Sequence, residues 1–199
     1  GLETLDWSES LKETQRNWIG KSVGASVEFR LLDEKKEFKS IAIKTFTTRP
    51  DTIFGVTFLT LAPEHELVNK ITTIDQSIEV EEYITVSAKK TERERMADVK
   101  NITGVFTGAY AKHPITKELI PIWIGDYVLA GYGTGAVMAV PCGDQRDYDF
   151  AKHFGISIKN IFEGIDISEK AHSEKEGTII ANSDFINGLS YKEATDKVI

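Results

Sequence analysis

The chain has 199 residues, 41% hydrophobic and 10% aromatic, so it is long and apolar enough to bury the core of one domain. Its 31 acidic and 24 basic residues give a formal charge of −7. This balance argues against a freestanding nucleic-acid binder, which needs a basic surface to displace the counterions of phosphates.

The first half of the chain predicts one helix followed by short strands. A helix is expected from Ser8 to Ile19, where an apolar face recurs before Gly20. Alternating apolar and polar residues, or short apolar runs, predict strands at 25–31, 41–45 and 57–61. Pro63 is placed to open a further helix that ends near Ile71.

The second half predicts a similar mixture. Helices are expected at 77–96 and 144–154, and a last one after Ser190, which has capping-box spacing to Glu193. Strands are expected at 105–111, 119–129, 136–140, 156–162 and 178–181. Many short strands with few helices indicate an α+β domain, with a β-barrel-like sheet and peripheral helices.

The stretch from Tyr132 to Tyr148 reads Y-G-T-G-A-V-M-A-V-P-C-G-D-Q-R-D-Y and is the most informative part of the chain. Its glycines allow a tight turn and close approach of another molecule, and a short buried strand follows them. Asp144 suits the N-cap of a helix, with Asp147 on the same face. These two carboxylates, close together where the expected strand gives way to the helix, could hold a small cation such as an amine. An ordinary strand–loop–helix connection explains the same residues equally well.

The run G-T-G-A-V-M-A-V-P-x-x-D-Q-R-D-Y resembles the signature of the editing domain inserted in leucyl-tRNA synthetases. Thr45–Thr52, T-F-T-T-R-P-D-T, resembles the threonine-rich region of the same domain. Asn17–Ser22, N-W-I-G-K-S, is similar to the stretch that leads from the synthetase body into the insertion. The resemblance thus spans nearly the whole chain. It implies that residues 1–24 are a connecting helix and linker, and that residues 25–199 are the barrel-like editing domain.

The resemblance also implies an activity, the hydrolysis of the ester in mischarged tRNA(Leu) by a positioned water. Norvaline, isoleucine and methionine are the expected errors. One methylene gives only ~1–3 kcal/mol of discrimination in an apolar pocket, so a second selective site improves fidelity. Neither the H-I-G-H nor the K-M-S-K-S signature of the synthetic site occurs. We therefore expect no cofactor in this domain, and ATP and magnesium only in the parent synthetase.

Roles for individual residues follow from the same resemblance. Asp147 matches the aspartate that pairs with the α-ammonium group of the amino acid. Thr47 and Thr48 would contact the terminal ribose and the attacking water. Thr52 would narrow the side-chain pocket, and Arg49 would meet the phosphate or ribose of the tRNA end. Without the resemblance, these threonines indicate only a strand and a turn.

Four further residues complete the predicted site. Met138 and Val140 would line the pocket walls, although a purely structural role explains both equally well. Tyr132 would contact the nucleotide. Asp144 could orient the loop or the substrate, although a plain N-cap role is favoured for it.

Other catalytic arrangements are disfavoured. The single cysteine, Cys142, excludes an internal disulfide and is expected to be a buried bystander. The histidines are scattered without metal-ligand spacing, so no metal site is predicted and each is expected on the surface or in a helix: His65, His113, His153 and His172. Relatives of this type commonly carry a histidine directly before D-Q-R-D, but here that residue is Gly143. The identity of any general base is therefore open.

Two alternatives to the leucyl-type activity remain. The valyl-type editing domain shares T-T-R-P but typically has glutamate where Asp51 stands. A non-catalytic module that docks the tRNA end or a partner protein is the second alternative, and it predicts no ester hydrolysis.

The expected partners are the 3′ end of tRNA(Leu) and the remainder of the synthetase chain, in a monomeric protein. No apolar run approaches the ~20 residues of a membrane span, so no membrane contact is expected. A single cysteine fits the reducing cytoplasm. Because the first residue is glycine, the chain is expected to be a piece of a longer protein, and its acidic charge predicts weak tRNA binding in isolation.

Overall fold

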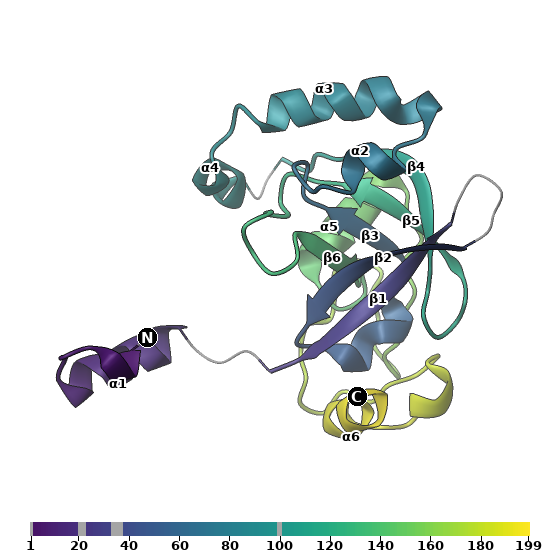
Figure 1. The fold of residues 1–199 in the computed structure, drawn as a ribbon. Coiled ribbons are helices and arrows are strands. Elements are labelled where there is room, and N and C mark those ends of the chain that lie inside the picture. The colour runs from purple at the N-terminus through teal and green to yellow at the C-terminus, as the bar shows by residue number, and fades with distance from the viewer. Residues whose placement is uncertain (1, 20–22, 33–37, 99–100) are drawn as a thin grey trace.

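The structure is a computed structural model that describes residues 2–19, 23–32, 38–98 and 101–199 (Figure 1). The strands are β1 (Ala25–Leu32), β2 (Phe38–Thr47), β3 (Phe58–Leu61), β4 (Val105–Lys112), β5 (Leu119–Ile124) and β6 (Ala136–Ala139). The α-helices are α1 (Glu9–Ile19), α2 (Val68–Ile71), α3 (Ser77–Ser87), α4 (Glu92–Ala97), α5 (Gln145–Phe154) and α6 (Tyr191–Val198). Short 3₁₀ segments are η1 (Leu2–Thr4), η2 (Pro50–Gly55), η3 (Ile74–Gln76) and η4 (Asp184–Ile186).

The strands form one mixed sheet in the order β2-β1-β4-β5-β3-β6. Neighbouring strands are antiparallel except for β3 and β5, which are parallel. The two end strands, β2 and β6, approach each other, but no ladder joins them among the described residues (Figure 1). The sheet is therefore a barrel that is nearly closed and open along one seam, which confirms the predicted α+β, barrel-like fold with peripheral helices.

The core follows from strand alternation. In β1, Phe29 and Leu31 are buried and Arg30 between them is exposed, as a strand with one face inward requires. All residues of β3 are buried because both faces of this strand are covered: on one face, Phe58 meets Phe150 and Thr60 meets Tyr127. Phe58 of β3 stacks on Phe150 of α5, with ring centroids 5.2 Å apart. This stack fixes α5 against the barrel.

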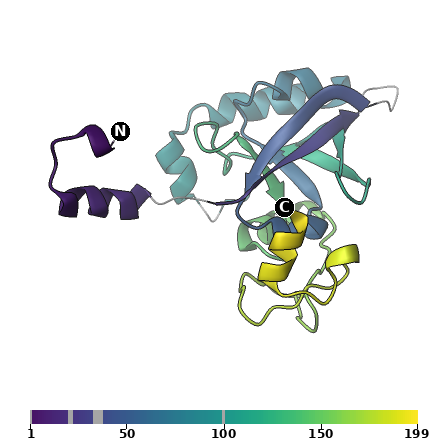
Figure 2. The ribbon, with the colours of Figure 1, turned by 60° about the horizontal axis from the view of Figure 1, so that its bottom comes forward.

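The helices lie around the barrel, apart from the N-terminal segment. Figures 1 and 2 both show η1 and α1 away from the sheet, while α6 packs beside η2. The predicted helix at the N-terminus and the predicted capping box of Ser190 and Glu193 are both present. Gly20, before which the N-terminal helix was expected to end, lies outside the described residues. No described helix is long and apolar enough to cross a membrane.

The prediction of one continuous helix at 77–96 is wrong. The segment forms two helices, α3 and α4, because Thr91 caps a new helix. The Thr91 N–H donates to Glu94 Oε2 at 2.7 Å, and the Glu94 N–H donates to Thr91 Oγ1 at 3.2 Å. This reciprocal capping box satisfies backbone donors that a continuous helix would have used internally.

Four other predicted elements also differ from the structure. Pro63 opens no helix, since the chain turns at 63–67 before α2 begins at Val68. The strand expected to reach residue 129 ends at Ile124, because the Val128 N–H donates to Gly125 O and forms a turn. The expected strands at 156–162 and 178–181 reduce to the isolated bridges Phe162–Ile180 and Ile179–Ser190. Nearby backbone groups bond to the Asn160 side chain instead of a ladder.

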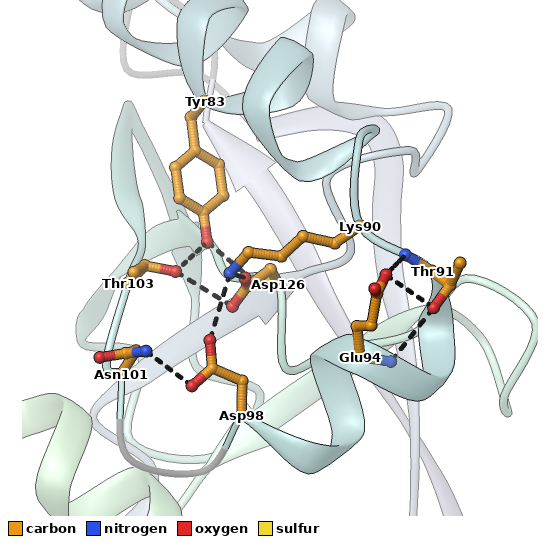
Figure 3. A network of polar contacts seen from close by, with 8 residues as sticks. All are labelled: Tyr83, Lys90, Thr91, Glu94, Asp98, Asn101, Thr103 and Asp126. Atoms are coloured by element: carbon orange, nitrogen blue, oxygen red, sulfur yellow. Dashed lines mark hydrogen bonds and ion pairs between the residues drawn. The ribbon is translucent and has the colours of Figure 1, made fainter.

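A polar network joins the α3–α4 region to the barrel (Figure 3). The Tyr83 hydroxyl contacts Thr103 Oγ1 at 2.9 Å and accepts the Asp126 N–H at 2.9 Å. Lys90 forms ion pairs with Asp126 at 2.9 Å and Asp98 at 3.5 Å. These hydrogen bonds and ion pairs therefore attach the α3–α4 region to the barrel, in addition to the burial of Val80.

Phe58→Ala should lower the free energy of unfolding by about 3–5 kcal/mol, because it removes the ring that stacks on Phe150 and leaves a cavity. Chemical denaturation followed by circular dichroism measures the change. Ile78→Ala is the control, since Ile78 is 71% exposed and its loss should cost no more than about 0.5 kcal/mol. Equal effects of the two variants would contradict the assigned core.

Candidate active site

A cavity of about 450 Å³ lies at the seam between β2 and β6. All nine site residues predicted from the sequence line it, although they come from two segments far apart in the chain. The full lining is Phe46, Thr47, Thr48, Arg49, Thr52, Tyr132, Val137, Met138, Val140, Gly143, Asp144 and Asp147. The open seam thus brings the threonine-rich segment and the glycine–aspartate segment together.

Asp147 lies in the first turn of α5 because Asp144 caps that helix. Asp144 Oδ1 accepts the N–H groups of Arg146 at 2.8 Å and Asp147 at 3.2 Å, which is the plain N-cap role. Asp147 is only 6% exposed. Its Oδ2 accepts the Val140 N–H at 2.8 Å, and its Oδ1 accepts from the Tyr127 hydroxyl at 3.5 Å. The carboxyl group is therefore held between the end of β6 and the start of α5.

The electrostatics of Asp147 are unusual. Burial, and secondly the carboxylate of Asp144, raise the pKa of Asp147 to about 8. The Val140 N–H, the Tyr127 hydroxyl and the Arg146 guanidinium act in the opposite direction. A desolvated carboxyl group that lines a cavity gains strongly from a cation placed beside it, since the attraction is weakly screened there.

The threonine-rich segment forms the facing wall. Thr47 ends β2, and its Oγ1 accepts the Arg49 N–H at 2.9 Å, while Thr48 is exposed in the bend that follows. Thr52 is buried in η2, and its Oγ1 donates to Arg49 O at 2.8 Å. Because this hydrogen bond and the β-branch restrict χ1, Thr52 presents a fixed surface to the cavity.

Arg49 is held in place at the edge of the cavity. Its Nε donates to Asp51 Oδ1 at 3.0 Å, and its Nη2 donates to Asp51 Oδ2 at 2.8 Å. Its Cζ lies 5.5 Å from the centroid of the Tyr191 ring of α6. Asp51 is fully buried and supplies a bidentate partner, so it acts on the site through Arg49.

Sequence reasoning did not assign three of the lining residues to the site. Phe46 is 45% exposed beside the threonines, and the β2 alternation that buries Ile43 and Thr45 could have identified it as facing the other way. Val137 is similarly exposed in β6. Gly143 leaves room for a side chain, since an added Cβ would lie 3.5 Å from Val140 and 3.6 Å from Phe162.

The cysteine and the histidines lie outside this lining. Burial raises the pKa of the Cys142 thiol to about 12, so it is a neutral, buried group as predicted. The prediction for His113 is wrong, because it is 1% exposed and in no helix. Its Nδ1 accepts two turn N–H groups and its Nε2 contacts Ile53 O at 2.9 Å, and burial lowers its pKa. The described residues contain no cluster of three or more histidine, cysteine, aspartate or glutamate side chains suited to a metal.

Asp147→Asn should stabilise the fold at alkaline pH. The folded-state pKa of about 8 lies above the ordinary value of 3.8, so the folded state favours the proton and stability falls as the pH rises between them. We expect the variant to gain roughly 2–5 kcal/mol near pH 8.5 and much less near pH 5. Chemical denaturation at both pH values measures this, with Asp149→Asn, exposed on the same helix, as the control. A gain independent of pH would contradict the buried titration.

Comparison with known proteins agrees with this geometry. Residues 16–199 match the family described as leucyl-tRNA synthetase, editing domain. The chain is 70% identical to the leucine–tRNA ligase of Christiangramia forsetii over 100% of its own length and 20% of that protein. It is 55% identical to that of Parabacteroides distasonis over 98% of this chain and 21% of that protein.

A solved structure, the LeuRS–tRNA–LeuAMS ternary complex of Agrobacterium radiobacter K84, matches 100% of this chain and 21% of its own, with a TM-score of 0.69 and 32% identity. The chain thus spans about a fifth of the length of the relatives it matches. The matched family and both relatives are of the leucyl type. The chain therefore belongs to the leucyl-tRNA synthetase editing domain family.

Proposed function

We propose that this domain hydrolyses the ester of tRNA(Leu) that carries a wrong amino acid, such as norvaline, isoleucine or methionine. The observation that carries the proposal is the meeting of Asp147 with Thr47, Thr48 and Thr52 around one cavity at the barrel seam. A buried carboxyl group opposite threonine hydroxyls suits a small ligand that has an ammonium group next to an ester.

In this proposal the ammonium group pairs with Asp147. Entry of the cation offsets the desolvation that raises the pKa of the carboxyl group, so the bound pair is ionic. The pairing fixes the ester carbonyl relative to the threonine-rich wall, where Thr47 and Thr48 hold the ribose and a water. Water adds to the carbonyl carbon, the ester C–O bond breaks and the ribose oxygen takes up a proton. Orientation supplies much of the acceleration, because an aminoacyl ester is already reactive.

The rim of the cavity would receive the nucleotide. Tyr132 is 82% exposed on the glycine-rich loop, which leaves its ring available for stacking on a base. Arg49, fixed by Asp51, offers a guanidinium at the same rim. The charge of −7 is unfavourable for holding a whole tRNA, so the remainder of the parent synthetase would bind the tRNA body. Residues 1–24 would be the connection to that remainder.

The correct product must survive, so the site needs to exclude leucine. Met138 and Val140 supply apolar walls, and Thr52 supplies a wall that its hydrogen bond to Arg49 O holds still. Linear norvaline and β-branched isoleucine would fit beside Thr52, whereas the γ-branch of leucine would clash. Steric exclusion achieves this selection, which attraction to a similar ester does not.

Asp147→Ala should abolish deacylation of norvalyl-tRNA(Leu) by the full-length ligase that contains this domain, a loss of about 30-fold or more. The variant removes a charge-assisted contact worth roughly 2–4 kcal/mol. Loss of the radiolabelled ester over time measures the rate, and Asp149→Ala, exposed on the same helix, should keep the wild-type rate. Near-normal hydrolysis by Asp147→Ala would remove Asp147 from the mechanism. No hydrolysis by the wild type would favour the non-catalytic docking module instead.

Thr52→Ala should make the full-length ligase hydrolyse its correct product, leucyl-tRNA(Leu). The substitution removes a methyl and a hydroxyl group from the wall, so the γ-branch of leucine gains room. Net leucylation should fall while leucine activation, measured by pyrophosphate exchange, stays unchanged. Thr52→Ser, which keeps the hydrogen bond to Arg49 O, should be intermediate. A Thr52→Ala enzyme that clears norvalyl-tRNA and spares leucyl-tRNA would show that another residue excludes leucine.

A further inference from the structure

Tyr127 contacts Asp147, the residue proposed to bind the substrate ammonium group, but it does not line the seam cavity itself. It lies in the turn after β5, and its hydroxyl donates to Thr60 Oγ1 at 3.0 Å or to Asp147 Oδ1 at 3.5 Å. It does not line the seam cavity, but a separate cavity of about 240 Å³ together with Arg146 and Phe150. Tyr127 therefore reaches Asp147 from a residue position that does not line the seam cavity.

We propose that Tyr127 is a positioning residue for Asp147: its hydroxyl, anchored on Thr60, holds Oδ1 and favours the ionised carboxylate that captures the substrate ammonium. This inference rests on the proposed function. The Val140 N–H donates to Oδ2 at 2.8 Å. Together with the Tyr127 contact, this gives each carboxylate oxygen of Asp147 one hydrogen-bond donor from the protein.

Tyr127 has one hydroxyl proton, so it donates either to Thr60 or to Asp147, depending on the charge of Asp147. While Asp147 is protonated, Tyr127 donates to Thr60, where the distance is the shorter one. When Asp147 ionises, Tyr127 turns its proton to Oδ1, and the Thr60 hydroxyl rotates to donate to the Tyr127 oxygen. Both hydroxyls can donate and accept, so the exchange needs no movement of the backbone.

The charged groups around Asp147 act on its ionisation in opposite directions. Asp144 opposes ionisation from the start of α5, and Arg146 beside it favours ionisation. Cys142 is a neutral thiol, and Arg49 across the seam cavity is paired with Asp51. Burial raises the pKa of Tyr127 well above its usual range, so the hydroxyl keeps the proton that it donates.

The ring of Tyr127 has little freedom to leave this position. It packs against Phe150 with centroids 5.6 Å apart. A Cβ at Gly125 would lie 2.9 Å from the ring and 3.0 Å from Thr60 Cγ2, so glycine permits the close approach of these two side chains.

The test is Tyr127→Phe in the full-length ligase, with single-turnover deacylation of norvalyl-tRNA(Leu) measured from about pH 6 to pH 8.5 after subtraction of uncatalysed loss. Removing a hydrogen bond to the charged form should raise the pKa of Asp147 by about one unit. The wild-type rate should then exceed the variant rate about tenfold near pH 6.5 and only about threefold near pH 8.5. Loss of the substrate ammonium at high pH affects both enzymes equally.

Controls separate positioning from stability. Tyr110→Phe removes the hydroxyl of a 40% exposed tyrosine in β4, and should leave the pH profile unchanged. Thr60→Val keeps the ring but removes its anchor, so it should shift the profile in the same direction as Tyr127→Phe. Thr60→Ser should restore the wild-type profile.

A loss of rate that is the same at every pH, or a profile unmoved by both Tyr127→Phe and Thr60→Val, overturns the inference. Should Tyr127→Phe fail to fold, the Thr60→Val profile decides alone. Asp147→Ala in the same assay keeps the two failures distinct. Full activity of Asp147→Ala would contradict both the proposed function and this inference. An inactive Asp147→Ala enzyme, together with an unchanged pH profile of Tyr127→Phe, would contradict only the role of Tyr127.

Discussion

The incomplete closure of the barrel determines where the candidate site lies in this domain. Each strand is hydrogen-bonded to its neighbours in the order β2-β1-β4-β5-β3-β6, while β2 and β6 approach each other without a ladder. A closed barrel would fill that seam with paired backbone. Here it is lined by the side chains of two motifs that the chain separates widely. The cavity that we propose selects the substrate therefore lies at an edge that the fold leaves unpaired.

At the seam, the fold buries the carboxyl group of Asp147, and burial favours the neutral form of that group. Burial of Asp147 disfavours its charge, and the Val140 N–H together with Tyr127 only partly offsets that cost. Structural stability and the proposed capture of an ammonium group thus oppose each other at one residue. Such opposition is common where a site is organised before its ligand arrives, since a solvated carboxylate would bind an ammonium weakly.

The sequence predicted which residues line the seam cavity better than it predicted the boundaries of the elements. Each motif is local, so the N-cap of Asp144 and the threonine segment were readable from neighbouring residues. The contact of Tyr127 with Asp147 depends on how β5 and α5 pack, and no spacing rule reports it. The break at Thr91 was missed because helical periodicity outweighed its capping box, and His113 because its partner, Ile53 O, lies far along the chain.

Positions 125 and 127 cannot drift independently as this family diverges. A side chain at Gly125 would press on a ring that Thr60 and Asp147 hold by its hydroxyl, so the ring has no direction in which to yield. A larger residue at position 125 would therefore require the loss of the hydroxyl or of the ring at position 127. We expect the two positions to vary together among relatives, so that the residue at 125 indicates whether a hydroxyl stands beside Asp147.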